Sequence, residues 1–255
     1  MPLTLSPLRK IPLIRQGDDL VDTVVNALRE NRIALLDHDI LVFAQKIVSK
    51  AEGRRVNLTT VTPSSHAIEL AEQTEKDARL VELILRESNE VMRTRPGTIV
   101  VEHKLGFVCA NAGIDHSNVA GPEEPTGEWV LLLPAAPDRS AEKIRREIES
   151  KTGKRIGVLI IDSHGRAWRN GTVGTAIGLS GLPGLEDLRG KPDLFGRALR
   201  ITQVGVADEL AAAASLIMGQ AAEGTPVVHV RGFPYPLREG TLRELIRPKE
   251  LDLFR

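Results

Sequence analysis

The chain has 255 residues, 42% of them hydrophobic, and its 34 basic residues balance 34 acidic ones. This balance gives no general attraction to nucleic acid, and five Phe, two Trp and one Tyr are too few to build a platform for stacking bases. The single cysteine, Cys109, excludes an internal disulfide and a cysteine zinc cluster, and no run approaches the length of an apolar membrane span. The N-terminus lacks the apolar core of a signal peptide, so we expect a soluble protein of the cytoplasm.

Short β-like runs alternate with helical patterns along the chain. Strands are predicted over residues 8–14, 39–48, 128–134, 156–161 and 225–232, with a hairpin over 97–115. Helices are predicted over residues 19–30, 64–74, 77–88, 140–153 and 208–224. An acidic Pro/Gly-rich loop is predicted over residues 119–128. This order predicts an α/β or mixed α+β fold. We expect one domain over residues 1–255, or two intimately packed subdomains.

The apolar run 156–161 ends abruptly at Asp162, which is followed by Ser163 and by small and basic residues. Ligands commonly gather beyond the ends of buried strands, and a carboxylate there suits Mg²⁺ or Mn²⁺. Arg166 and Arg169 could face phosphate or carboxylate oxygens, and the glycines that follow would let backbone approach a ligand. The alternative is that Asp162 only forms a turn. The residues by themselves leave both interpretations open.

Other polar groups follow predicted strands or helices. Asp115 and His116 close the predicted hairpin, where Asp is also an ordinary turn residue. Lys46 and Lys50 follow a buried strand, a position at which most lysines are simply solvated. The stretch from Met218 to Pro226 is either a glycine helix stop or a close approach to a flat ligand.

Several familiar signatures are absent from the sequence. It contains no P-loop, no Rossmann glycine fingerprint and no GxSxG nucleophile elbow. Cys109 lies in an apolar context typical of a structural thiol. The residues alone therefore predict an enzyme with two aspartate-bearing turns that could share a divalent cation beside an anionic substrate.

Five motifs together resemble the coenzyme F420 γ-glutamyl ligase family. They occur in one order and span nearly the whole chain: VSKAEGR, CANAGIDHSNV, GKRIGVLIIDSHGRAWRNGTVGTAIGLSG, DLFGRALRITQVGVADELAAAASLIMGQ and PVVHVRG. The resemblance implies an unusual α/β fold with mixed sheets and an intertwined homodimer. It also implies a single ligase domain without the nitroreductase-like domain that some members carry. Its implied activity is the GTP-dependent joining of L-glutamate to coenzyme F420-0, and of further γ-linked glutamates, through an acyl phosphate. Mg²⁺ or Mn²⁺, at two sites, and K⁺ are the implied cations.

The resemblance also assigns roles to particular residues. Asp115, Asp162, Ser163 and Gln220 match metal-binding positions. The nucleotide-binding positions are Ile11, Pro12, Leu13, Ile14, Gln45, Lys50, Asn118, Met218, Gly219, Gln220, Ala221, Ala222, Glu223, Gly224 and Thr225. Beyond the metal ligands no catalytic residue is assigned, and Arg166 and Arg169 are candidates for added positive charge.

Two positions depart from the family pattern. Gln220 stands where a metal-binding glutamate is expected, and Glu223 could substitute for it. Gln45 replaces a smaller hydroxyl residue. Two alternatives stay open. A metal-dependent phosphohydrolase needs the same aspartates but no amine acceptor. A deazaflavin- or nucleotide-binding protein whose metal site has decayed would agree with the neutral Gln220.

Overall fold

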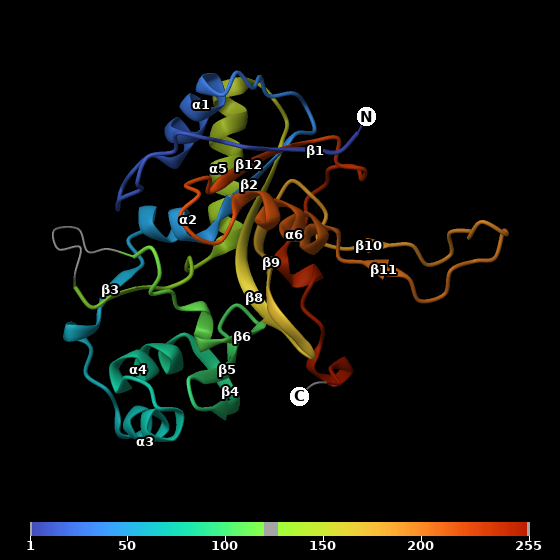
Figure 1. The fold of residues 1–255 in the computed structure, drawn as a ribbon. Coiled ribbons are helices and arrows are strands. Elements are labelled where there is room, and N and C mark those ends of the chain that lie inside the picture. The colour runs from blue at the N-terminus through green and yellow to red at the C-terminus, as the bar shows by residue number, and fades with distance from the viewer. Residues whose placement is uncertain (1, 120–126, 254–255) are drawn as a thin grey trace.

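The computed structural model describes residues 2–119 and 127–253 (Figure 1). The strands are β1 (Thr4–Pro7), β2 (Ile40–Ala44), β3 (Arg55–Asn57), β4 (Ser88–Arg95), β5 (Thr98–His103), β6 (Val108–Ala110), β7 (Trp129–Leu131), β8 (Gly157–Arg166), β9 (Arg169–Ser180), β10 (Glu186–Asp187), β11 (Gln203–Val204) and β12 (Val227–Arg231). The helices are α1 (Leu20–Glu30), α2 (Gln45–Ala51), α3 (Ser65–Thr74), α4 (Ala78–Arg86), α5 (Pro137–Thr152) and α6 (Val206–Met218). The predicted mixture of α and β elements is confirmed.

A five-stranded mixed sheet forms the centre of the molecule, in the order β1-β12-β2-β8-β9. Only β2 and β8 are parallel, and their pairing runs from Ile40 opposite Gly157 to Ala44 opposite Ile161. Beyond Ala44, β8 continues as a two-stranded hairpin with β9. The sheet therefore narrows at the carboxyl end of the parallel pair, immediately before Asp162.

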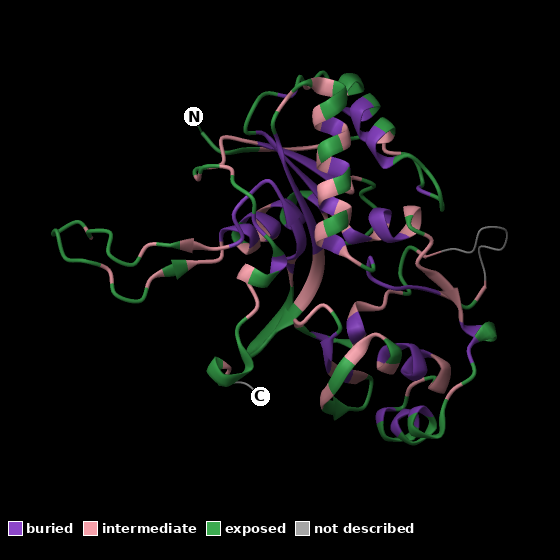
Figure 2. Cartoon of the chain, turned by 180° about the vertical axis from the view of Figure 1, so that it is seen from behind, coloured by how far each residue is buried: buried purple, intermediate pink, exposed green. Residues whose placement is uncertain are grey.

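Both faces of this sheet are covered by helices. One face packs against α1 and α5 through residues such as Phe43 and Ile160, and the other packs against α6 through residues such as Val42 and Ile161. Because neighbouring side chains on a strand point to opposite faces, strands buried on both sides read as continuous apolar runs. In Figure 2 the centre of this sheet is buried, whereas the far end of the β8–β9 hairpin is exposed.

A second, smaller layer lies beside the main sheet. Here α3 and α4 pack on the three-stranded sheet β4-β5-β6 around a separate apolar cluster that includes Ile84, Ile99 and Cys109. Burial raises the pKa of the Cys109 thiol to about 12, so this cysteine is an inert packing group. The short pair β3-β7 connects this layer to the main sheet.

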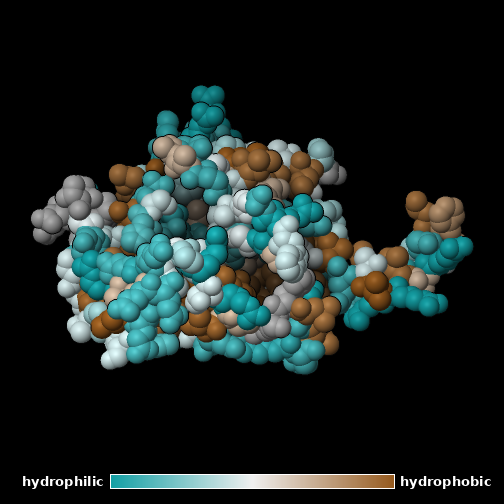
Figure 3. All heavy atoms as spheres, turned by 60° about the horizontal axis from the view of Figure 1, so that its bottom comes forward, coloured by the Kyte–Doolittle hydropathy of each residue, from teal (hydrophilic) through white to brown (hydrophobic). Residues whose placement is uncertain are grey.

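Residues 186–204, which include β10 and β11, form an arm that projects from the main body (Figure 1). Its exposed hydrophobic side chains are Leu194 (99% exposed), Phe195 (85%) and Ile201 (88%). In the space-filling view of Figure 3 hydrophobic atoms stand at the far end of this arm. So much exposed apolar surface on one projection is typical of an interaction site.

Several predicted boundaries were wrong. Residues 8–14 form no strand, and the edge strand is Thr4–Pro7, since Pro12 within the predicted run has no N–H to donate. The strand predicted to run through Val48 ends at Ala44, where α2 begins. The helix predicted to reach residue 224 ends at Met218, because Gly219 takes a positive φ of 74°.

Other elements were missed or lie outside the description. Strand β4, SNEVMRTR, was not predicted because most of its side chains are polar and it lies at the edge of its sheet. The loop predicted over residues 119–128 lies largely outside the described residues.

Candidate functional site

Asp162 belongs to a strand, not to the turn that the sequence predicted. It continues β8 and lies opposite Thr175 of β9, and the turn of this hairpin comes only after Arg166. Asp162 nevertheless lies just beyond the carboxyl end of β2, where a ligand was expected. His164 shares its face of the strand, and the His164 Nε2 lies 3.1 Å from Asp162 Oδ2.

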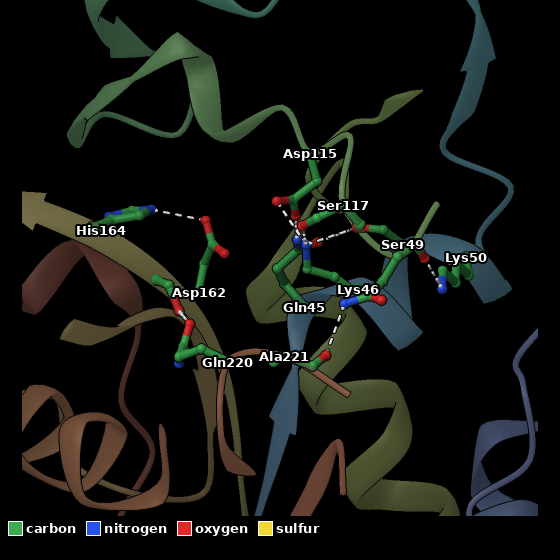
Figure 4. Close-up of polar contacts among 12 residues, drawn as sticks. Gln45, Lys46, Ser49, Lys50, Asp115, Ser117, Asp162, His164, Gln220 and Ala221 are labelled. Carbon is green, nitrogen blue, oxygen red and sulfur yellow. Dashed lines mark hydrogen bonds and ion pairs between the residues drawn. The ribbon is translucent and has the colours of Figure 1, made fainter. Parts of the chain in front are cut away.

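Asp115 approaches the same place from the segment that follows β6 (Figure 4). Its backbone is fixed by two hydrogen bonds with Leu131 of β7, at 3.0 and 2.9 Å. Its carboxylate accepts a hydrogen bond from Gln45 Nε2 at 2.5 Å and forms an ion pair with Lys46 Nζ at 2.7 Å. Gln45 is in turn held by Ser49, one helical turn further along α2. The strand-to-helix junction at Ala44 thus aims two side chains at Asp115.

The charge of Asp162 acts on the carboxylate of Asp115. Burial raises the pKa of Asp115, Lys46 opposes this rise, and the negative charge of Asp162 adds to it. Asp115 and Asp162 therefore lie close enough to interact although they come from different layers. Such a concentration of negative charge favours a bound cation.

A second set of contacts links α2 to the loop after α6. Lys50 Nζ donates to the backbone oxygen of Asn118 at 2.7 Å, and Asn118 Nδ2 donates to the backbone oxygen of Ala221 at 3.2 Å. Burial lowers the pKa of Lys50, and the nearby cations Arg55 and Lys46 add to this effect. A crowded group of cations of this kind is suited to an anionic ligand.

Ser163 and Gln220 meet on the opposite face of β8 from Asp162. Ser163 Oγ donates to Gln220 Oε1 at 2.8 Å, and Gln220 Nε2 donates to Ser215 of α6 at 2.9 Å. Glu223 instead folds onto its own loop, where its carboxylate accepts the Ala221 N–H at 2.8 Å. Gln220, rather than Glu223, is therefore the loop side chain that reaches β8.

Residues 218–225 form a loop that closes on itself beside these groups. Thr225 Oγ1 donates to the Met218 backbone oxygen at 3.0 Å. Gly219 has a positive φ, and a Cβ at this residue would lie only 2.2 Å from the Glu223 side chain, so that a larger residue would not fit here. Ala222 and Gly224 complete the loop and are exposed.

The predicted N-terminal nucleotide segment lies near Lys50. Arg55 donates to the backbone oxygen of Ile14 at 3.0 Å, and Ile11 packs on the apolar cluster beneath α1. Leu13 is 90% exposed. Arg166 and Arg169 do not reach the aspartate site. They are opposite each other in the strand register, at the exposed end of the β8–β9 hairpin. At about 3.3 Å per residue, Arg166 lies about 13 Å along the strand from Asp162.

An aromatic wall supports Asp162, and sequence reasoning missed it. His103 stacks on Phe107 with a ring separation of 5.3 Å, and Phe107 contacts His164 at 5.2 Å. Burial lowers the pKa of His103 to about 4, so its ring is neutral at pH 7. The spacing of Asp162 and His164, two residues apart on one strand, could have predicted that these two side chains share a face. Nothing in the sequence predicted that the β5–β6 hairpin packs Phe107 against His164.

The glycines of β9 serve packing rather than ligand access. A side chain at Gly174 would place its Cβ 2.4 Å from Ser215 of α6, and one at Gly178 would place it 2.4 Å from Pro137 of α5. These glycines let both helices lie directly on the sheet. The interpretation that they make room for a ligand was therefore wrong for these two positions.

The donor set around β8 has the chemistry of a hard-cation site. Asp115 and Asp162 offer carboxylate oxygens on one face, while Ser163 and Gln220 offer a hydroxyl and an amide oxygen on the other. Within the described residues no three His, Cys, Asp or Glu side chains converge as a complete metal cage. Mg²⁺ commonly binds one or two protein carboxylates and completes its shell with water and substrate phosphates, so these residues fit such an ion.

Comparisons with known proteins identify the family of the chain. The chain matches the F420-0:Gamma-glutamyl ligase family over residues 9–232. It is 49% identical to the Coenzyme F420:L-glutamate ligase of Methanothermobacter thermautotrophicus over 258 residues, covering 100% of both chains. The proteins of the same name from Methanocaldococcus jannaschii and Archaeoglobus fulgidus are 50% and 44% identical, over 86% and 100% of this chain and 85% and 97% of theirs.

These matches and the described site define an enzyme of the ligase class. The chain belongs to the F420-0:Gamma-glutamyl ligase family. No helix in the part of the chain that the structure describes is long and apolar enough to cross a membrane.

Proposed function

We propose that this protein joins L-glutamate to coenzyme F420-0 in the biosynthesis of coenzyme F420, with GTP converted to GDP and phosphate. The observation that carries the proposal is the Asp115–Lys46 ion pair near the end of the parallel strands, within electrostatic range of Asp162, in a chain of this family. GTP as the nucleotide, Mg²⁺ or Mn²⁺ as the divalent ion, and K⁺ as a helper ion are parts of the same proposal.

Amide formation needs a better leaving group than the oxide of a carboxylate. The terminal carboxylate of the F420-0 lactyl group would attack the γ-phosphorus of GTP, so that an acyl phosphate forms and GDP leaves. The amine of glutamate then attacks the acyl carbon, phosphate departs, and the amine gives up a proton to form the neutral amide. The same sequence, repeated on the new γ-carboxylate, adds further glutamates.

All reacting partners are anions, so the site must hold concentrated negative charge. Divalent ions held by Asp115 and Asp162, and by Ser163 and Gln220, would supply neutralising charge at the phosphates. Lys46 and Lys50 add two ammonium groups, and Lys46 already pairs with Asp115. Gln45 orients the same carboxylate through its amide N–H.

The nucleotide would lie between the residues 11–14, the amino groups of α2 and the loop 218–225. Asn118 already links α2 to this loop, because it accepts a hydrogen bond from Lys50 and donates one to Ala221, and Ile14 accepts a hydrogen bond from Arg55 of the neighbouring β3.

The proposal is tested by incubating the protein with F420-0, GTP, Mn²⁺ and L-glutamate and measuring the products by mass spectrometry. We expect glutamate-dependent GDP release together with F420-1 and longer products, and a lower rate when Na⁺ replaces K⁺. GDP release that ignores glutamate would instead indicate a phosphohydrolase. Binding of F420-0 and GTP without turnover would indicate a binding protein with a decayed metal site, an alternative that Gln220 favours.

We further propose that the active protein is a homodimer formed through the arm of residues 186–204. Its exposed Leu194, Phe195 and Ile201 support this proposal, because an isolated monomer would leave them in water.

A further inference from the structure

A pocket of about 300 Å³ lies beside the aspartate site. It opens between the first turn of α5, strand β9, the β5–β6 turn and the segment after β12, and its apolar lining includes Leu105, Ile177 and Ile246. Two guanidinium groups, those of Arg139 and Arg243, also line it. We infer that this pocket receives the flat ring of the deazaflavin substrate, with the two arginines contacting its acidic tail. This inference rests on the proposed function and assigns a place to one substrate.

The pocket adjoins Asp162 by two routes through the fold. Leu105 belongs to the same short turn as Phe107, which contacts His164, and His164 bonds to Asp162. On the sheet, Ile177 of β9 is two residues from Thr175, the strand partner of Asp162. A ring bound in the pocket therefore has its tail within reach of the carboxylate site.

The charges at the pocket favour an anion. Among the described residues, no hydrogen bond or ion pair holds the guanidinium group of Arg139 or of Arg243, and both residues are exposed. Arg139 lies in the first turn of α5, where the helix dipole disfavours a cation. Two unpaired guanidinium groups, one of them at a helix end that is already positive, form a ready contact for phosphate or carboxylate oxygens.

Asp138, the carboxylate that also lines this pocket, is already hydrogen-bonded to backbone N–H groups. The carboxylate of Asp138 accepts the N–H of Leu179 at 2.9 Å and the N–H of Leu242 at 3.1 Å. Asp138 thereby ties α5, β9 and the C-terminal segment together around the pocket. Gly178 allows Pro137 to rest directly on β9, so the walls are formed before any ligand binds. A preformed pocket with an apolar lining and a few charged groups is typical of a site for a small molecule, and the two guanidinium groups favour an anionic one.

The test measures binding of F420-0 by calorimetry, without GTP or divalent metal. Arg139→Ala and Arg243→Ala should each raise the Kd for F420-0 about tenfold, the usual loss for one charge-assisted hydrogen bond. Arg146→Ala is the matched control, because Arg146 is exposed on the same helix but pairs with Glu142. Ala135→Trp, at an exposed position on the pocket wall, should fill the pocket and raise the Kd at least as much.

The possible outcomes separate this inference from the proposed function. An unchanged Kd in both arginine variants and in Ala135→Trp, with F420-1 still formed by the unmodified chain, would overturn the pocket assignment alone. If the unmodified chain neither binds nor converts F420-0, both proposals fail. If these variants weaken GTP binding and leave F420-0 binding unchanged, the pocket belongs to the nucleotide and the assignment is wrong. Circular dichroism checks that every variant is folded.

Discussion

At the scale of single residues, Asp162 is the side chain on which the proposed chemistry depends most. Asp162→Asn keeps the size of the side chain and the strand pairing of β8 but removes its charge. We expect GTP turnover to fall by at least about 100-fold, since even outer partners of metal ligands commonly contribute 10–100-fold. Steady-state GDP release checks this. Asn170→Asp, on β9 at the exposed end of the same hairpin, is the control for a change of one charge. Undiminished F420-1 formation by Asp162→Asn would remove this residue from the mechanism.

The departure from the family pattern at Gln220 gives another prediction at this scale. Gln220→Glu adds a carboxylate where Gln220 already contacts Ser163, so Mn²⁺ should bind about tenfold more tightly. Glu223→Ala should leave Mn²⁺ binding unchanged, because the Glu223 carboxylate caps its own loop. Calorimetric titration with Mn²⁺ compares the two variants. The reverse pattern, with Glu223→Ala losing Mn²⁺, would assign the second site to Glu223.

The sequence indicated most of the polar residues but not how they meet. Asp115, Asp162 and Lys50 were identified from their positions after apolar runs and from the family motifs. Lys46 was interpreted as a solvated lysine, although it forms an ion pair with Asp115. That contact depends on the path of the chain through β7, which no local pattern reveals.

At the scale of elements, the start of β2 is fixed by a buried ion-pair network. Asp39 accepts hydrogen bonds from Arg231, at 2.9 and 2.7 Å, and lies 2.8 Å from His229 Nε2. Burial works against its charged form, but the bonds from Arg231 and His229 hold the pKa of Asp39 well below its ordinary range. This network joins the start of β2 to the neighbouring strand β12 in the main sheet.

The network makes stability depend on pH in a predictable direction. Because the folded state lowers the pKa of Asp39, its contribution is complete above the unfolded pKa of about 3.9 and is lost as pH falls below that value. Asp39→Asn should lower the free energy of unfolding at pH 7 by about 3 kcal/mol, since Arg231 loses its buried partner. In this variant the free energy of unfolding should also fall less steeply below about pH 4 than in the unmodified chain. Urea unfolding at several pH values tests this, with the exposed Asp37→Asn as control. Equal stability of Asp39→Asn and the unmodified chain would contradict it.

Elements were predictable where burial leaves a pattern and not where pairing decides. The apolar runs of β2 and of the first half of β8 were predicted because both faces of the main sheet are covered. The second half of β8, residues 162–166, was interpreted as a turn because its residues are polar and small. It is a strand only because β9 returns alongside it. The pairing of residues 162–166 with β9 is therefore decided by the tertiary fold rather than by the local strand preference of these residues.

At the scale of the whole molecule, the arm gives a prediction about assembly. Phe195→Ser together with Leu194→Ser should shift the protein from dimer to monomer, because the two changes remove the exposed apolar side chains at its end. Light scattering after gel filtration measures the mass. Leu216→Ser, at an exposed apolar position on α6, is the control and should leave the dimer intact. A monomeric unmodified chain at micromolar concentration would contradict the dimer.

At this scale the proposed mechanism requires that Asp115 and Asp162, which come from different layers of the molecule, bind one ion. The most direct measurement is anomalous diffraction from crystals grown with Mn²⁺ and a non-hydrolysable GTP analogue. We predict a manganese peak bound by both carboxylates and by phosphate oxygens, with Lys46 displaced from Asp115. A structure with bound nucleotide, saturating Mn²⁺ and no peak between these two side chains would contradict the account.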